Sequence, residues 1–222
     1  MDILLTPYDT TDMLVLKANY SFTSYAENLG NGRFSLKPLD RSTQVAPVNG
    51  IVVADVNVDG NLDVMMIGND YGNEVFSGRF DACTGLVLLG AGNGEFFSVP
   101  AVKSGFRVNG DAKALAKLRH VSGDELFIAS QNQDSLRVFR TTTKDKLKRF
   151  FQPSASDSWA ELHYTQGKKE RVEFYYGSGY LAQSTRSIFV PATVSKIQVY
   201  DFQGNQRSIG YDQLATAADD KE

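Results

Sequence analysis

The sequence contains a single cysteine, Cys83, among its 222 residues. One thiol excludes an intrachain disulfide and any zinc site built on several thiolates. Its nearest basic neighbour in the sequence is Arg79, so nothing local activates Cys83 as a nucleophile. Long apolar runs are also missing: none approaches the ~20 residues needed to span a bilayer, and the N-terminus lacks the pattern of a signal peptide. We therefore expect no membrane span in this chain.

Histidine is almost as scarce, because His120 and His163 are the only two and lie in different parts of the chain. No Ser/His/Asp or Cys/His constellation can be assembled from them, which predicts a protein that is not an enzyme. The formal net charge is -3, and the one basic run, residues 144–149, is interrupted by Asp145. Nucleic-acid binding needs clustered basic residues, so we expect no nucleic-acid partner.

What the sequence does contain is a series of short apolar runs bounded by Gly, Asn, Asp and Pro. The runs at 51–54, 64–67, 86–89 and 126–129 are continuously apolar, as is typical of strands buried on both faces. Residues 111–118 could form a helix on local propensity alone, but the repeat described next places a strand there. The sequence predicts an all-β fold.

A repeat of about sixty residues organises the chain up to residue 150. Asn31-Gly32-Arg33-Phe34 returns 62 positions later as Asn93-Gly94-Glu95-Phe96, and residues 63–66 align with 125–128 at the same shift. Shifted back by 61 positions, residues 63–66 align with residues 2–5. A unit of this length with four short strands has the size of a β-propeller blade. We expect residues 1–150 to form about two and a half antiparallel blades of a partial β-propeller, as a C-terminal fragment of a larger protein.

The most specific motif is the acidic loop, residues 55–63, which reads Asp-Val-Asn-Val-Asp-Gly-Asn-Leu-Asp. Oxygen-bearing side chains occupy alternate positions, and Gly60 permits a sharp turn. Ca²⁺ takes roughly six to eight oxygen ligands, which a tight loop can supply from alternate side chains and a backbone carbonyl. The sequence predicts a Ca²⁺ site with these ligands: the side chains of Asp55, Asn57, Asp59 and Asp63, and the carbonyl of Asn61.

Two alternatives bear on this loop. An EF-hand would need a bidentate Glu at the twelfth position, where this chain has Met66 inside an apolar β run. A polar turn could also use Asp and Asn side chains to cap strand ends without any ion. We interpret the loop as a structural calcium clip with the ~10⁻⁴–10⁻³ M affinity of extracellular modules. In the next repeat its positions align with Lys117, Arg119 and Val121, so we expect no ion there.

From about residue 151 the repeat stops and alternating strands follow, for example at 159–164 and 196–200. We predict a small β-sandwich-like module over residues 151–214. The tail, residues 215–222, is small and charged and is expected to fray.

The acidic loop, the sixty-residue period and the Asn-Gly-x-Phe strand start together resemble FG-GAP/VCBS repeats, as in integrin α-chain propellers. Residues 78–82 and 85–90 look like those of large bacterial surface or secreted VCBS-repeat proteins. Residues 172–200 are similar to the ASPIC/UnbV module, although Val190-Pro191-Ala192 stands where that module usually has a Gly-rich turn. The resemblance implies a calcium-binding extracellular or cell-envelope propeller fragment that acts in adhesion or ligand binding.

Three residues are candidates for contact with a protein or glycan ligand at the cell surface. Arg79 and Asp81 could bind a ligand, or could form a salt bridge that fixes the loop carrying them. In a strand, Phe174 and Tyr176 share one face and Tyr175 takes the other, so Tyr175 is the candidate for stacking on a sugar ring. The alternative function is therefore a glycan-binding or accessory module of a polysaccharide-active protein. We also expect self-association through the edge of the truncated blades.

Overall fold

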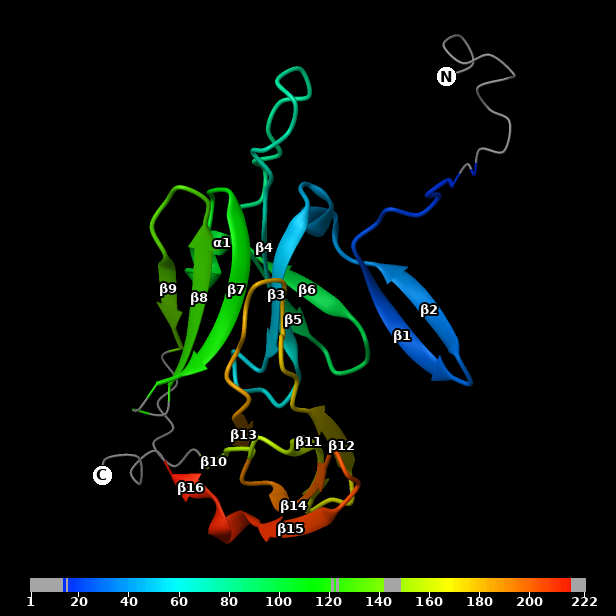
Figure 1. Cartoon of the computed structure of the whole chain (residues 1–222), viewed down its shortest axis with the longest axis vertical. Coiled ribbons are helices and arrows are strands. Elements are labelled where there is room, and N and C mark those ends of the chain that lie inside the picture. Colours follow the sequence, from blue (N-terminus) through cyan, green and yellow to red (C-terminus); the bar gives the residue numbers. More distant parts are fainter. Residues whose placement is uncertain (1–13, 15, 121, 123, 142–148, 217–222) are drawn as a thin grey trace. The chain divides into compact units, whose positions relative to one another are not determined.

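The computed structural model describes residues 14, 16–120, 122, 124–141 and 149–216, which form short antiparallel strands (Figure 1). The chain divides into two compact units, Met1–Leu39 and Asp40–Glu222. In the described residues the helical elements are α1 (Ala101–Ser104) and two 3-10 turns, η1 (Arg41–Gln44) and η2 (Tyr211–Gln213). The predicted all-β class is confirmed.

The first unit is a hairpin of β1 (Ser24–Gly30) and β2 (Arg33–Pro38). Its turn residues, Asn31 and Gly32, both have positive φ, at 52° and 70°. This is the pairing that a two-residue hairpin turn favours, since its backbone matches the twist of the strands. The strand expected at residues 2–5 lies outside the described residues.

The second unit begins with two antiparallel sheets in which strands consecutive in sequence are neighbours. Their strands are β3 (Val48–Ala54), β4 (Asp63–Gly68), β5 (Leu86–Gly90) and β6 (Phe96–Val99) in one sheet, and β7 (Ala112–Arg119), β8 (Glu125–Gln131) and β9 (Arg137–Arg140) in the other. β7 covers the stretch of helical propensity, so the strand expected from the repeat is confirmed. Pairing with β8 overrides the local preference.

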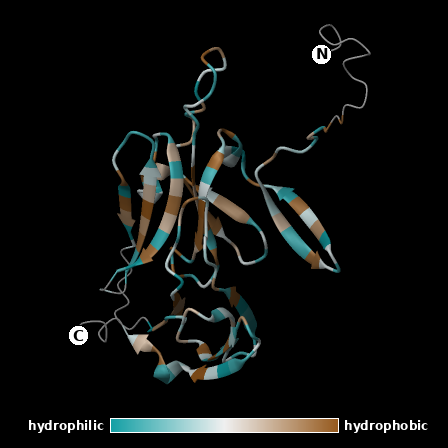
Figure 2. Ribbon diagram, in the orientation of Figure 1, coloured by the Kyte–Doolittle hydropathy of each residue, from teal (hydrophilic) through white to brown (hydrophobic). Residues whose placement is uncertain are grey.

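These two sheets share one apolar core, in which Val52, Met65 and Ile67 meet Leu115 and Phe127. In the hydropathy view these strands carry brown bands between white and teal ones, whereas the connecting loops are largely teal and white (Figure 2). The sheets approach so closely that a Cβ on Gly50 would lie 2.8 Å from the backbone nitrogen of Leu115. Only glycine fits at that position without displacing β7.

The structure preserves the repeat in the strands but changes one loop. β5 starts 62 positions after β1, and β8 starts 62 positions after β4. The β7–β8 connection, residues 120–124, is however three residues shorter than the β3–β4 connection, residues 55–62. The alignment of Lys117 and Arg119 with loop positions was therefore wrong, because both lie inside β7. Val121 lies outside the described residues.

The C-terminal strands form two further sheets. Their orders are β12-β11-β14-β15 and β13-β10-β16. The bounds are β10 (Arg149–Phe151), β11 (Asp157–Tyr164), β12 (Lys169–Glu173), β13 (Ile188–Val190), β14 (Val194–Asp201), β15 (Gln206–Gly210) and β16 (Ala215–Thr216). Both sheets contribute to one buried cluster that includes Phe151, Leu162 and Ile197. The expected domain boundary at residues 150 and 151 falls inside β10.

The expected tail is ordered at its start. Ala215–Thr216 pairs with β10, and the Arg149 guanidinium donates to the carbonyls of Tyr211, Asp212 and Leu214 at 2.9–3.2 Å. The pairing holds residues 215 and 216 in place. The predicted frayed tail therefore does not begin at residue 215. Residues 217–222 lie outside the described residues.

The loop that follows β12 runs along the edge of β7, as Figure 1 shows. The Thr185 amide donates to the Lys117 carbonyl at 2.7 Å, and the Lys117 amide donates to Ser184 Oγ at 2.9 Å. This contact satisfies backbone groups that an uncovered edge strand would leave open to other chains. None of the described sheets closes on itself, so the propeller stays a prediction.

Candidate metal centre

The acidic loop between β3 and β4 is closed by its own side chains. Asp55 accepts hydrogen bonds from the amides of Asp59 and Gly60, at 3.1 and 2.9 Å. Asn57 Oδ1 accepts from the Asp59 amide at 3.1 Å, and Asp59 Oδ1 accepts from the Asn61 amide at 2.8 Å. The side chains at alternate positions are therefore turned toward the backbone of the same turn.

Asp63, at the start of β4, joins this loop to the rest of the sheet. It is fully buried, and its two carboxylate oxygens accept from the amides of Val56 and Gly90, each at 2.9 Å. Burial raises the pKa of Asp63, and the nearby charges of Asp55 and Asp59 raise it further. Among the described residues no ion pair involves these three carboxylates, so their mutual repulsion has no basic side chain to relieve it.

The backbone of the loop is strained at one position. Val58 has φ of 61° and Gly60 has φ of 87°. Glycine adopts this left-handed region freely, but a β-branched residue there costs about 1–2 kcal/mol. Strain of this kind persists only where the surrounding structure imposes it, and it clusters at functional sites. Here it places Asn57 and Asp59 so that both contribute oxygens to one turn.

The donor chemistry of the loop fits Ca²⁺, because every candidate ligand is a carboxylate, amide or carbonyl oxygen. The Asn61 side chain lies against the β5–β6 loop, where a Cβ on Gly92 would be 2.4 Å from its Oδ1. Asn61 would therefore bind an ion through its backbone carbonyl rather than through its side chain. No three His, Cys, Asp or Glu side chains in the described residues are gathered closely enough to hold an ion. The carboxylates act as hydrogen-bond acceptors here, and ion binding would require them to move closer together.

In the hairpin of β7 and β8 a lysine neutralises the carboxylate at the start of the second strand. Glu125 begins β8 as Asp63 begins β4, and its carboxylate lies 3.2 Å from Lys117 Nζ. Both side chains of this pair are largely buried. A lysine therefore supplies the positive charge in the shorter hairpin, whereas the longer hairpin carries three carboxylates and no lysine.

The ligand candidates Arg79 and Asp81 lie on the long connection between β4 and β5, and both are exposed. The Arg79 guanidinium sits over the ring of Tyr71, 4.8 Å from its centroid. Within the described part of the chain no salt bridge joins the two residues to each other, so the salt-bridge alternative stays a prediction. The loop is fixed by other contacts, which the sequence pattern did not reveal.

Tyr175 is 64% exposed, just beyond the end of β12. Phe174 is buried, but Tyr176 is exposed too, because the strand ends at Glu173 and the alternation of faces ends with it. The Tyr176 hydroxyl donates to the Ala155 carbonyl at 3.0 Å, so this ring serves the module's own structure. No described contact links Tyr175 to Arg79 or Asp81, which belong to a different part of the unit.

A scan of the chain against models of protein families finds no match, and a search of curated proteins finds none either. The resemblance to FG-GAP/VCBS and ASPIC/UnbV proteins therefore rests on the quoted motifs alone. Within the described residues, no helix has the length and apolar character needed to cross a membrane.

Proposed function

We propose that this chain is a non-enzymatic, calcium-binding β-repeat protein of the FG-GAP/VCBS propeller type. It acts in adhesion or ligand binding outside the cell or in the cell envelope. Ca²⁺ is the proposed ion, and the acidic loop is its proposed site. The ion would link β3 to β4 and hold the hairpin in register, which is a structural role.

One observation carries the proposal: fully buried Asp63 faces the charges of Asp55 and Asp59. A buried carboxylate beside two others is costly, and the two amide hydrogen bonds that Asp63 accepts only partly compensate the cost, because its pKa stays raised. The Lys117–Glu125 pair meets this need in the shorter hairpin. Ca²⁺, which prefers oxygen ligands from a flexible loop, meets it in the longer one.

The test is thermal unfolding in EDTA and in 10 mM CaCl₂. With a dissociation constant of ~10⁻⁴ M, this concentration stabilises the fold by about 2.7 kcal/mol. For a chain of this size each kcal/mol shifts the Tm by about 2–4 °C, so we expect a rise of about 5–11 °C. Asp59→Ala should abolish the rise.

The matched control is Asp201→Ala, because Asp201 Oδ1 also caps an exposed turn by accepting from the amides of Gln203 and Asn205. That turn has a single carboxylate and is not a candidate calcium site. Its variant should keep the full calcium response. An unchanged Tm of the unaltered protein on chelation refutes the metal assignment.

A glycan ligand is the second candidate, and the exposure of Tyr175 favours it. Trp159 and Tyr200 already contact other side chains of the module. Trp159 stacks on Tyr200 with ring centroids 3.8 Å apart, and the Arg171 guanidinium covers the Trp159 ring at 4.1 Å. The Tyr175 ring is thus freer than those of Trp159 and Tyr200 to stack on a sugar. Glycan-array binding that Tyr175→Ala removes would support this function, and binding unchanged by that substitution would count against it.

We also propose self-association through the β3–β6 sheet. Ile51 and Val53 alternate with buried Val52 and Ala54 on β3, and about half of each side chain is exposed. Exposed apolar residues on a sheet face favour packing against another chain.

A further inference from the structure

The connection between β4 and β5, residues 69–85, ends in an apolar tip. Val75 is 100% exposed and Phe76 is 87% exposed. The corresponding connection between β8 and β9 spans only residues 132–136, so the fold does not need a long loop at this place. In Figure 1 the β4–β5 loop projects beyond the ends of the strands.

The base of the loop is firmly held. Asn69, which is fully buried, donates from Nδ2 to the carbonyls of Cys83 and Gly110 at 2.8 and 2.9 Å, and its Oδ1 accepts from the Cys83 amide at 2.9 Å. One residue further out, Asp70 and Phe80 exchange two backbone hydrogen bonds of 2.9 Å. The two arms of the loop are thereby tied together and to the segment that leads into β7.

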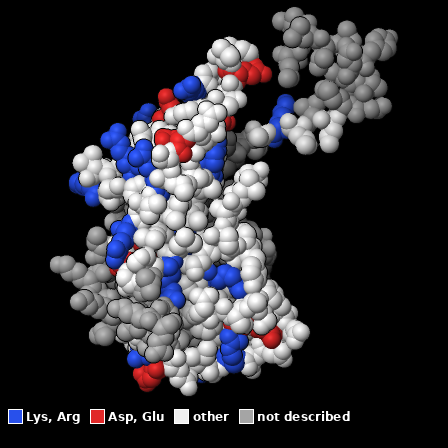
Figure 3. Space-filling model, turned by 60° about the vertical axis from the view of Figure 1, so that its left-hand side comes forward, with Lys and Arg blue, Asp and Glu red and all other residues white. Residues whose placement is uncertain are grey.

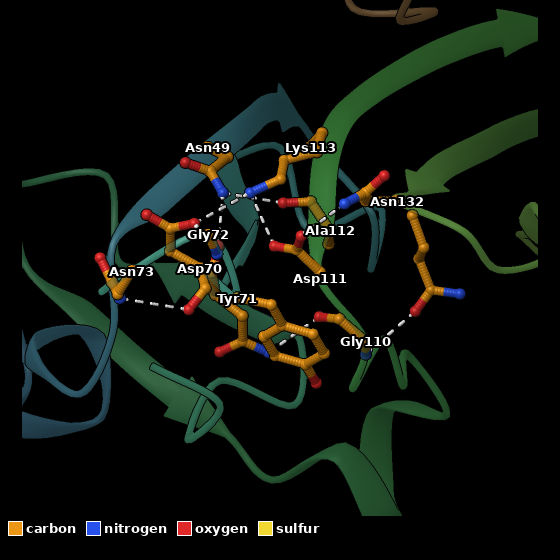
Figure 4. A network of polar contacts seen from close by, with 12 residues as sticks. Asn49, Asp70, Tyr71, Gly72, Asn73, Gly110, Asp111, Ala112, Lys113 and Asn132 are labelled. Carbon is orange, nitrogen blue, oxygen red and sulfur yellow. Dashed lines mark hydrogen bonds and ion pairs between the residues drawn. The ribbon is translucent and has the colours of Figure 1, made fainter. Parts of the chain in front are cut away.

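A second group of contacts supports the stem from the side, and Figure 4 shows those that Lys113 makes with Asp70 and Asp111. Lys113 Nζ lies 2.6 Å from Asp111 and 3.5 Å from Asp70. The Tyr71 hydroxyl donates to the Asn109 carbonyl at 3.4 Å, and Arg79 covers the Tyr71 ring. The loop is thus a built element rather than a slack connection.

At the tip, the Ser77 amide donates to the Glu74 carbonyl at 2.8 Å. This bond closes a turn whose central residues are Val75 and Phe76, so both side chains are directed outward. Leaving a valine and a phenylalanine in water forgoes about 1.5–3 kcal/mol for each. A preformed turn can recover this energy on binding at little entropic cost.

The charges on the loop indicate what it binds. Asp70 is paired with Lys113 at the stem, so toward the tip Glu74 and Asp81 outnumber the one basic residue, Arg79, and the projecting loop shows red acidic residues beside white ones in Figure 3. An acidic loop is repelled by anionic lipid, and two apolar side chains are too few to anchor a chain in a bilayer. A second copy joined tip to tip would place two acidic tips against each other, and like-charge repulsion disfavours that contact.

We propose that the β4–β5 loop inserts Val75 and Phe76 into an apolar pocket with a basic rim on a partner protein. A concave site is required, since only a pocket can surround both side chains of so narrow a tip. The proposal specifies the partner surface for the binding role above. It does not require Ca²⁺, because Asn69 and Asp63 lie at opposite ends of β4.

The test replaces Phe76 with the photoreactive residue p-benzoylphenylalanine in the full chain and irradiates it with a cell-envelope protein fraction from the source organism. The control places the same residue at Val102, which is 95% exposed on α1 but has no comparable stem. We expect a discrete protein adduct from position 76 and none from position 102. Unlabelled protein should suppress the adduct at least tenfold, and the variant V75S/F76S should not.

The captured protein is then purified and its Kd measured. V75S/F76S should weaken binding at least tenfold with an unchanged Tm, whereas V102S should leave the Kd unchanged. Binding should persist in EDTA, which separates this result from failure of the calcium proposal. The docking proposal is overturned by equal labelling from both positions, by equal suppression with V75S/F76S, or by label recovered in lipid or in a second copy of this chain.

Discussion

Replacing Asp63 with alanine tests the role of the acidic loop most directly. The Asp63 carboxylate is fully buried and accepts from two backbone amides, those of Val56 and Gly90, at 2.9 Å each. Hydrogen bonds to a charged acceptor contribute about 1.5–3 kcal/mol each, but the raised pKa of Asp63 shows that burial offsets part of this gain. We expect Asp63→Ala to lower the free energy of unfolding by about 2–5 kcal/mol.

Asp63→Asn separates charge from shape. The amide oxygen keeps one of the two amide donors, while its NH₂ group faces the other. The burial of a negative charge is removed at the same time. We therefore expect a smaller loss of about 1–2 kcal/mol.

The measurement is urea unfolding followed by circular dichroism, with the change in stability taken from the shift in midpoint at constant slope. In EDTA the two variants should rank as stated. In CaCl₂ the unaltered protein should gain stability and neither variant should, so the difference widens. If Asp63→Ala falls within about 1 kcal/mol of the unaltered protein in EDTA, these two hydrogen bonds do not contribute as argued.

Three further predictions concern the loop, the C-terminal module and the exposed sheet face. Val58→Asn should raise the unfolding free energy by about 0.5–1 kcal/mol, because asparagine tolerates positive φ, and a lower urea midpoint would contradict the assigned strain. Burial raises the pKa of Asp157, but hydrogen bonds from Arg207 and Ser154, together with the charge of Arg207, outweigh it and hold the pKa below the ordinary 3.8. This contribution is therefore complete above pH 3.8 and is lost as the pH falls through the lower folded value, so Asp157→Asn should flatten acid unfolding below pH 4. Light scattering should show a mass above 24.5 kDa that rises with concentration and returns to 24.5 kDa in the double variant Ile51→Ser and Val53→Ser; a constant 24.5 kDa for the unaltered protein would refute self-association.

The sequence by itself determined the features that depend on local pattern. Continuous apolar runs predicted β4 and β5, and the shift of 62 positions predicted β8 from β4. The repeat also identified β7 as a strand against its helical propensity. Such predictions succeed because strand formation and hairpin turns follow from side-chain periodicity and from which residues tolerate positive φ.

The tertiary structure decided what depends on partners distant in sequence. The shorter β7–β8 loop was hidden because β7 starts two positions later than the repeat predicts and is one residue longer than β3, so the shift returns to 62 at β8. Asn69 reads as an ordinary loop residue, yet its bonds to Cys83 and Gly110 make it the base of the projecting loop. Ala215–Thr216 is a strand only because it pairs with the edge of β10. Hydrogen bonds between such distant residues form only once the chain has folded, so no local pattern encodes them.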